Sequence, residues 1–84
     1  MRIWAKLMTD GHIKKQYVYE NPEQLTYSHF FEYLTEICYA LDIPTPVLTK
    51  TNIFNFAKFN HVKFVKSDFV ESLGYGFLML ENLF

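Results

Sequence analysis

Cysteine is almost absent from this sequence. Cys38 is the single cysteine among 84 residues, which excludes an intramolecular disulfide and a metal site built from several cysteines. Its position within an apolar helical pattern predicts a small, buried, unreactive side chain. A chain without disulfides suits a reducing compartment, and we therefore expect a cytoplasmic location.

Long hydrophobic runs are also missing. No stretch approaches the roughly 18 consecutive apolar residues that a membrane-spanning helix requires. The chain opens with the alternating segment MRIWAKLM rather than with a charged segment followed by an apolar run, so we expect no signal peptide. These absences predict a protein without a membrane partner.

Motifs of catalysis and of metal or phosphate binding are absent as well. The three glycines all lie in turn positions, which excludes a glycine-rich phosphate loop. The serines and Cys38 lie in no nucleophile-elbow motif, and His12, His29 and His61 have no metal-ligand spacing. We predict that the protein is not an enzyme and uses no cofactor or metal. The less favoured alternative is a small enzyme in which His61 works with Asp68 or Glu71.

Hydrophobic and aromatic residues are abundant. Half of the chain is hydrophobic and 19% is aromatic, with nine phenylalanines and six tyrosines, which argues against disorder. The length predicts one domain over residues 1–84. So many large apolar side chains exceed what one helix and a few strands can bury, and the excess predicts an interaction surface.

The clearest element is a helix over residues 26–41. Thr26 suits the N-cap and Pro44 follows the end. The spacing of the apolar residues predicts one buried stripe, while Glu32 and Glu36 lie on the opposite, solvated side. The predicted stripe contains Tyr27, Phe30, Phe31, Leu34, Ile37, Cys38 and Leu41.

The first twenty residues predict a β-hairpin around Asp10-Gly11. A two-residue turn would place Lys6 opposite Lys15, which is unfavourable. We therefore favour a one-residue bulge at Gly11. It would place the aromatic side chains of the second strand on the face of the first strand that carries Ile3, Ala5 and Leu7. The second-strand residues on that face would be Ile13, Tyr17 and Tyr19.

The remainder of the chain predicts more strands. Val47–Leu48 suit a short edge strand, and Thr51–Phe59 fits a helix or a strand, of which we choose a helix capped by Thr49 or Thr51. Residues 62–66 and 77–83 read as strands, the latter central and covered on both faces. The predicted fold is α+β: an antiparallel sheet of three to five strands, with an N-terminal hairpin and one main helix on one face. Residues 51–60, or a second copy of the chain, would cover the other face.

Residues 50–66 contain four basic residues and no acidic residue. Lys50, Lys58, Lys63 and Lys66 alternate there with phenylalanine and asparagine. Aromatic rings that stack on bases, combined with lysines that neutralise phosphates, are typical of single-stranded nucleic-acid binding. The whole chain carries a net charge of −1, however, and lacks the strongly basic footprint of most such proteins. This function is the first alternative.

The function that we favour is a small non-catalytic interaction module that forms a homodimer or binds another protein. Large aromatic side chains are favoured at protein interfaces. The candidates are Trp4, Tyr17 and Tyr19 on the hairpin, with Phe54 and Phe59 beside the basic stretch. Burial of each in the core of its own chain is the alternative interpretation.

Four short segments of the sequence, taken together, carry a resemblance to known proteins. They are MRIWAK at the start, LDIPTPV at 41–47, FNHVKF at 59–64 and SDFVES at 67–72. Together they resemble a group of short bacterial proteins of uncharacterised function and similar length. The resemblance implies a free-standing bacterial cytoplasmic protein, and it brings no functional residues to this chain.

Overall fold

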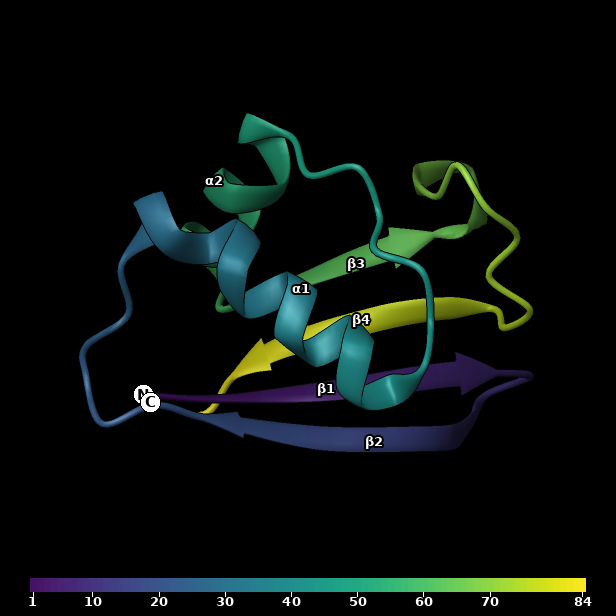
Figure 1. Cartoon of the computed structure of the whole chain (residues 1–84), viewed down its shortest axis with the longest axis horizontal. Helices are drawn as coiled ribbons and strands as arrows, with labels where there is room; N and C mark the ends of the chain where they lie inside the picture. Colours follow the sequence, from purple (N-terminus) through teal and green to yellow (C-terminus); the bar gives the residue numbers. More distant parts are fainter.

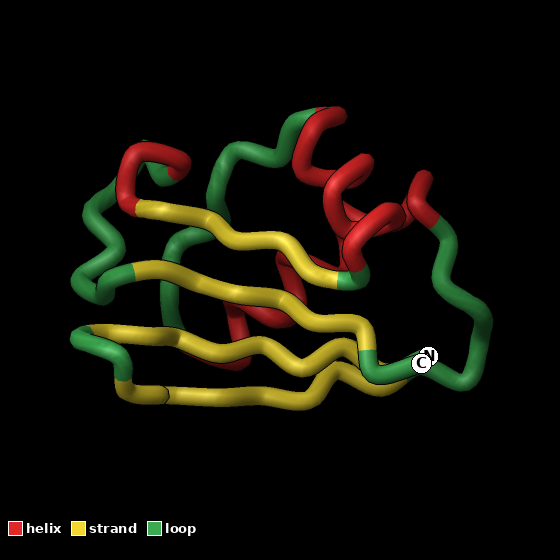
Figure 2. Tube along the Cα trace, turned by 180° about the vertical axis from the view of Figure 1, so that it is seen from behind, coloured by secondary structure: helices red, strands yellow, loops and turns green.

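The computed structural model describes all 84 residues as a two-layer α+β domain (Figure 1). A single antiparallel sheet has the strand order β2-β1-β4-β3. Both α-helices lie on the same side of it, as the view from behind in Figure 2 also shows. The elements are β1 (Arg2–Thr9), β2 (His12–Glu20), the 3-10 helix η1 (Tyr27–His29), α1 (Phe30–Leu41), α2 (Lys50–Phe59), β3 (His61–Val65), the 3-10 helix η2 (Lys66–Asp68) and β4 (Phe77–Asn82). The predicted fold class, hairpin and main helix are confirmed.

The core lies between the helices and the two central strands, β1 and β4. Alternate residues of each strand point toward the helices, because successive side chains of a strand leave on opposite faces. The rings of Phe30 in α1 and Phe56 in α2 meet edge to face with centroids 5.0 Å apart. The fully buried side chains include Ile3, Ala5, Leu7, Leu34, Ile37, Cys38, Phe64, Leu78 and Leu80.

The main helix is rotated relative to the predicted stripe. Phe30 and Leu34 are buried as expected, but Tyr27 and Phe31 are exposed. Tyr33 is buried instead and packs on Tyr19 of β2, with ring centroids 5.6 Å apart. The first turn is 3-10 and its N-cap Thr26 makes no side-chain cap hydrogen bond, so Tyr27 lies outside the α-helical periodicity. Phe31 and Tyr33 lie within the α-helix, and the direction from which the sheet meets the helix decides which of them is buried.

The hairpin has a two-residue turn and a bulge, and the bulge is not at Gly11. Asp10 and Gly11 both have positive φ and connect Thr9 to its partner His12. The irregularity lies beyond the turn, because Leu7 pairs with Lys15 but Met8 pairs with Ile13. Tyr17 and Tyr19 therefore share the face of Ile3 and Ala5 as predicted. Ile13 does not, because it lies on the turn side of the bulge.

The second half of the chain confirms the predicted helix and departs from prediction in two places. Val47 and Leu48 lie in a loop, where the Val47 N–H donates to the Asp68 carbonyl instead of to a strand. Residues 50–59 form the helix α2, capped by the Thr49 hydroxyl, which accepts from the Asn52 N–H. Strand β4 is central as expected, but only one of its faces is covered, since α2 lies on the same side as α1.

Gly76 allows the chain to enter β4 close to β1. Its N–H donates to the Met8 carbonyl at 2.8 Å, and a Cβ at this position would lie 2.7 Å from that oxygen. Only glycine fits so close an approach of two backbones. The approach fixes the register in which β4 joins the sheet.

Candidate functional site

The face of the sheet that points away from both helices is uncovered, and we call it the open face. The register between the strands shows which side chains stand beside one another on it. Three rows cross all four strands in the order β2, β1, β4 and β3. They are Ile13–Met8–Phe77–Val65, Gln16–Lys6–Met79–Lys63 and Val18–Trp4–Glu81–His61.

The first of these rows is entirely apolar, and we call it the apolar row. It runs across the sheet at the end where β1 and β2 are joined by their turn. Met8 and Phe77 in the middle are half-buried, whereas Ile13 and Val65 at its ends are 43% and 40% exposed. Four strands about 4.8 Å apart make this row roughly 15 Å long. An apolar band of this kind is typical of a surface that contacts another molecule.

Trp4 lies in a polar network at the centre of the open face. Its indole N–H donates to Gln16 Oε1 at 3.0 Å, and Lys6 Nζ lies 4.2 Å from its ring centroid. The same ammonium group is 3.6 Å from Glu81 Oε1. These contacts across three strands hold the Trp4 ring in one position, with one side against an ammonium group. The predicted interface residue Trp4 therefore lies on an exposed face of the sheet.

The open face continues around β3 to the end of α2. Lys63 Nζ lies 4.2 Å from the ring centroid of Phe77. Lys58 Nζ in turn lies 5.7 Å from the ring of Phe54 and 5.4 Å from that of Phe59. The two ion pairs of the structure, Arg2–Glu20 and Lys6–Glu81, involve neither lysine. This corner therefore has cations without carboxylate partners beside exposed aromatic rings.

The structure separates the other predicted site residues. Tyr17 is at the edge of the sheet, 39% exposed, whereas Tyr19 is in the core. Burial raises the pKa of the Tyr19 hydroxyl. Of the basic stretch, Lys50 begins α2 and Lys58 lies near its other end, while Lys66 begins η2 beyond β3. Only Lys58 and Lys63 lie at the corner of α2 and β3.

His61 is the first residue of β3 and is exposed. With Asn55, Phe59, Val62 and Lys63 it lines a hollow of about 210 Å³. Its ring lies 6.2 Å from that of Phe59. No hydrogen bond or ion pair joins it to a carboxylate, and Asp68 instead accepts from the Val65 N–H at the opposite end of the strand.

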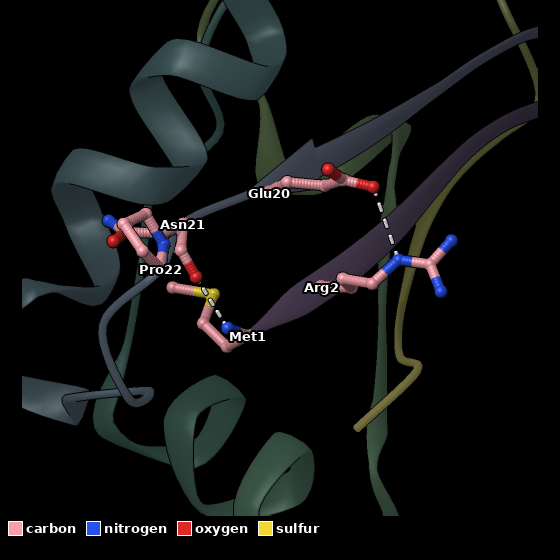
Figure 3. Close-up of a pocket in the computed structure, with 5 residues that line it drawn as sticks. All are labelled: Met1, Arg2, Glu20, Asn21 and Pro22. Atoms are coloured by element: carbon pink, nitrogen blue, oxygen red, sulfur yellow. Dashed lines mark hydrogen bonds and ion pairs between the residues drawn. The ribbon is translucent and has the colours of Figure 1, made fainter.

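A second hollow of about 440 Å³ lies where β1 begins and β2 ends (Figure 3). Its polar groups bond one another. Arg2 Nε is 3.2 Å from Glu20 Oε1, and the Met1 nitrogen donates to the Asn21 carbonyl. The remaining lining residue is Pro22. The hollow contains no pairing of a nucleophile with a base.

No group of three or more histidine, cysteine, aspartate or glutamate side chains is placed to hold a metal ion. None of the helices has both the length and the apolar character needed to cross a bilayer. A scan against protein-family models finds no match, and searches of curated proteins and of solved structures find none either.

The apolar row is the part of the site that the sequence interpretation missed. The sequence signal for this row is that two apolar residues stand next to each other in each of three strands. Met8 follows Leu7, Val65 follows Phe64 and Phe77 precedes Leu78. In each pair one side chain is in the core and the other is on the open face. Alternation identifies both sets, but only the side on which the helices pack shows which set is uncovered.

Proposed function

We propose that this protein is a small non-catalytic interaction module that binds an extended segment of another protein across its open face. The single observation that carries the proposal is the apolar row, which crosses all four strands and has no helix over it. Partner binding would remove this apolar area from water, which is the main favourable term in most protein association.

The charges around the apolar row suggest the chemistry of the partner. Lys63 lies in the neighbouring row without a carboxylate partner. Lys14 and Lys66 follow Ile13 and Val65 directly in sequence, one at each end of the apolar row. Complementary charge favours correct partners and disfavours others. We infer a partner segment with large apolar residues flanked by aspartate or glutamate.

A selection experiment tests this proposal. Random 12-residue peptides displayed on phage are selected on the immobilised protein, and the recovered peptides are measured by fluorescence anisotropy. We expect apolar peptides with acidic flanks, and Val65→Lys should weaken their binding by at least about tenfold, because it places a charge within the apolar row.

Tyr39→Lys is the matched control, because Tyr39 is an exposed residue of α1 on the other side of the molecule. It should leave peptide binding unchanged. Recovery of no peptides, or of peptides that bind both variants equally, would contradict the proposal.

Single-stranded nucleic-acid binding is a second candidate, favoured by the corner where Lys58 lies beside the rings of Phe54 and Phe59. Bases could stack on those exposed rings. The whole chain carries a net charge of −1 and lacks a strongly basic footprint. This ranks the function below protein binding.

The test uses a fluorescent oligothymidine. This candidate predicts an affinity that falls steeply with salt and is lost in the double variant Lys58→Glu, Lys63→Glu. The variant Lys14→Glu, Lys50→Glu changes the net charge equally but alters lysines away from the corner, so it should lose far less. Undetectable or salt-insensitive binding by the unaltered protein would remove this candidate.

A bacterial origin, as the resemblance implies, and a reducing cytoplasmic location remain part of the proposal. The lack of any disulfide suits the second of these. Fractionation of cells that produce the protein would test it, with the protein expected in the cytoplasmic fraction.

A further inference from the structure

Strand β2 is an edge of the sheet with no protection along most of its length. Eight of its nine residues are exposed, and it forms the lower margin of the molecule in Figures 1 and 2, with no helix or loop beyond it. The other edge, β3, is only five residues long, and the N–H of its last residue, Val65, donates a hydrogen bond to the Asp68 carboxylate. A long unpaired edge is a template for pairing with another strand.

The hydrogen bonds around β1 show which backbone groups of β2 point outward. Met1 and Asn21 exchange both N–H···O bonds, whereas the carbonyls of Arg2 and Met8 accept from the β4 side of the chain. Since bonded and non-bonded pairs alternate along antiparallel strands, Tyr17 and Tyr19 bond to β1. The N–H and C=O groups of Gln16, Val18 and Glu20 therefore point away from the sheet.

The regular part of this edge has a defined start and end. On one side the bulge between Lys15 and Ile13 interrupts the ladder, and on the other Pro22 has no N–H to donate. Residues 15–21 lie between these two interruptions. Val18 is the middle residue of that segment and is 38% exposed.

The segment is complementary to itself when one copy runs antiparallel to another about Val18. Val18 then faces Val18 of the second copy, and Gln16 faces Glu20, an amide beside a carboxylate. On the helix side Tyr17 faces Tyr19, and aromatic pairs across strands are favourable. Lys15 faces Asn21, so no two like charges are opposed. Each outward-pointing residue meets another outward-pointing residue, as hydrogen-bonded pairs require.

We propose that β2 pairs with β2 of a second copy about Val18, which produces a twofold-symmetric dimer with a continuous eight-stranded sheet. A symmetric contact uses the same patch on both copies, as this self-complementary segment does. The dimer extends the open face from four strands to eight. It uses the edge of the sheet rather than the apolar row, and so it does not depend on the proposed partner binding.

Mass measurement tests the dimer directly. Sedimentation velocity of the unaltered protein over a range of micromolar concentrations should show the mass of two chains. Val18→Pro should weaken dimerisation by at least about tenfold, because it removes hydrogen bonds at the symmetry axis while the N–H it replaces is unbonded in the single copy. Val18→Thr keeps the N–H and the branched side chain, and it should remain dimeric.

A cross-linking pair tests the register and does not depend on how well the proline variant folds. Val18→Cys places two thiols in one cross-strand pair, where the Cα atoms lie about 5.5 Å apart, as a disulfide requires. Gln16→Cys places them four residues apart along the strands, more than about 13 Å. Mild oxidation should link the first variant and not the second, and the buried Cys38 should take no part.

The outcomes separate this proposal from partner binding. A single-chain mass at all concentrations would overturn it, as would a dimer that is insensitive to Val18→Pro in a variant whose circular dichroism is unchanged. Cross-linking of Gln16→Cys in preference to Val18→Cys would overturn the register. Val65→Lys, which weakens peptide binding in the first proposal, should leave the dimer mass unchanged.

Discussion

Cys38 shows how burial controls the chemistry of a single residue in this protein. Its side chain has no exposed surface, and burial raises the pKa of the thiol to about 11. At pH 8 only about a thousandth of the molecules would then carry the thiolate, which is the reactive form. The prediction of an unreactive cysteine made from the helical pattern has this physical basis.

We predict that Cys38 of the folded protein reacts with a disulfide reagent such as DTNB at least about 100-fold more slowly at pH 8 than in the urea-unfolded chain. The absorbance change of the released thiolate measures both rates. Equal rates in the two states would contradict the buried position.

The same pKa predicts a dependence of stability on pH. Between about pH 9 and 11 the unfolded chain loses the thiol proton and the folded chain keeps it, so the unfolded state binds fewer protons and the free energy of unfolding falls as the pH rises. Burial of Tyr19 acts in the same direction at higher pH. Urea titrations of Cys38→Ala should show a shallower fall than those of the unaltered protein.

At the scale of elements, α2 illustrates how a local signal decides an ambiguous sequence. The apolar spacing of residues 51–59 suits a helix and a strand equally. Thr49 and Asn52 form a reciprocal capping box at the start, and Asn60 adopts a left-handed conformation at the end. These three polar residues at the two ends, rather than the hydrophobic pattern, identify the segment as a helix.

We predict that Thr49→Ala lowers the free energy of unfolding by about 1 kcal/mol, because it leaves the N–H of Asn52 without its cap. Thr51→Ala is the matched control. Thr51 lies inside the helix, exposed and without a side-chain hydrogen bond, and alanine has the higher helix propensity. Chemical denaturation should therefore show no loss for Thr51→Ala, and an equal loss in both variants would contradict the assigned cap.

At the scale of the whole molecule, stability depends on how the two layers are joined. Phe56 has no exposed surface and packs on Phe30, so it links α2 to α1 and to the sheet below. Phe54, two residues earlier on the same helix, is 61% exposed. The two phenylalanines have the same chemistry and opposite surroundings.

We predict that Phe56→Ala lowers the free energy of unfolding by about 3–5 kcal/mol, whereas Phe54→Ala changes it by less than about 0.5 kcal/mol. Phe56→Leu, with an expected loss of up to about 1.5 kcal/mol, keeps the measurement possible if the alanine variant unfolds. Urea denaturation followed by circular dichroism gives all three values. A similar loss for Phe54→Ala would show that α2 lies differently on the sheet.

The errors in the sequence interpretation have a common cause. The pattern of Tyr27 to Leu41 defines an apolar arc, but whether Phe31 or Tyr33 is buried depends on the direction from which the sheet meets the helix. Likewise the hairpin residues predict a bulge, while its position near Lys14 depends on how Met8 is held against β4. Both questions are decided by contacts between residues far apart in the chain.

The sequence by itself determined the two helices and four strands of this protein, since helix caps, turn residues and apolar periodicity act between near neighbours along the chain. It did not determine the loop at Val47 and Leu48, where a strand was predicted. It also determined the burial of Cys38 and the choice of an α+β domain. Only the tertiary structure decided that α1 and α2 share one side of the sheet, and hence that Met8 and Phe77 are uncovered. The physical reason is that a strand with apolar residues on both faces can pack against helices with either face, and the two helices of this chain cover only one face.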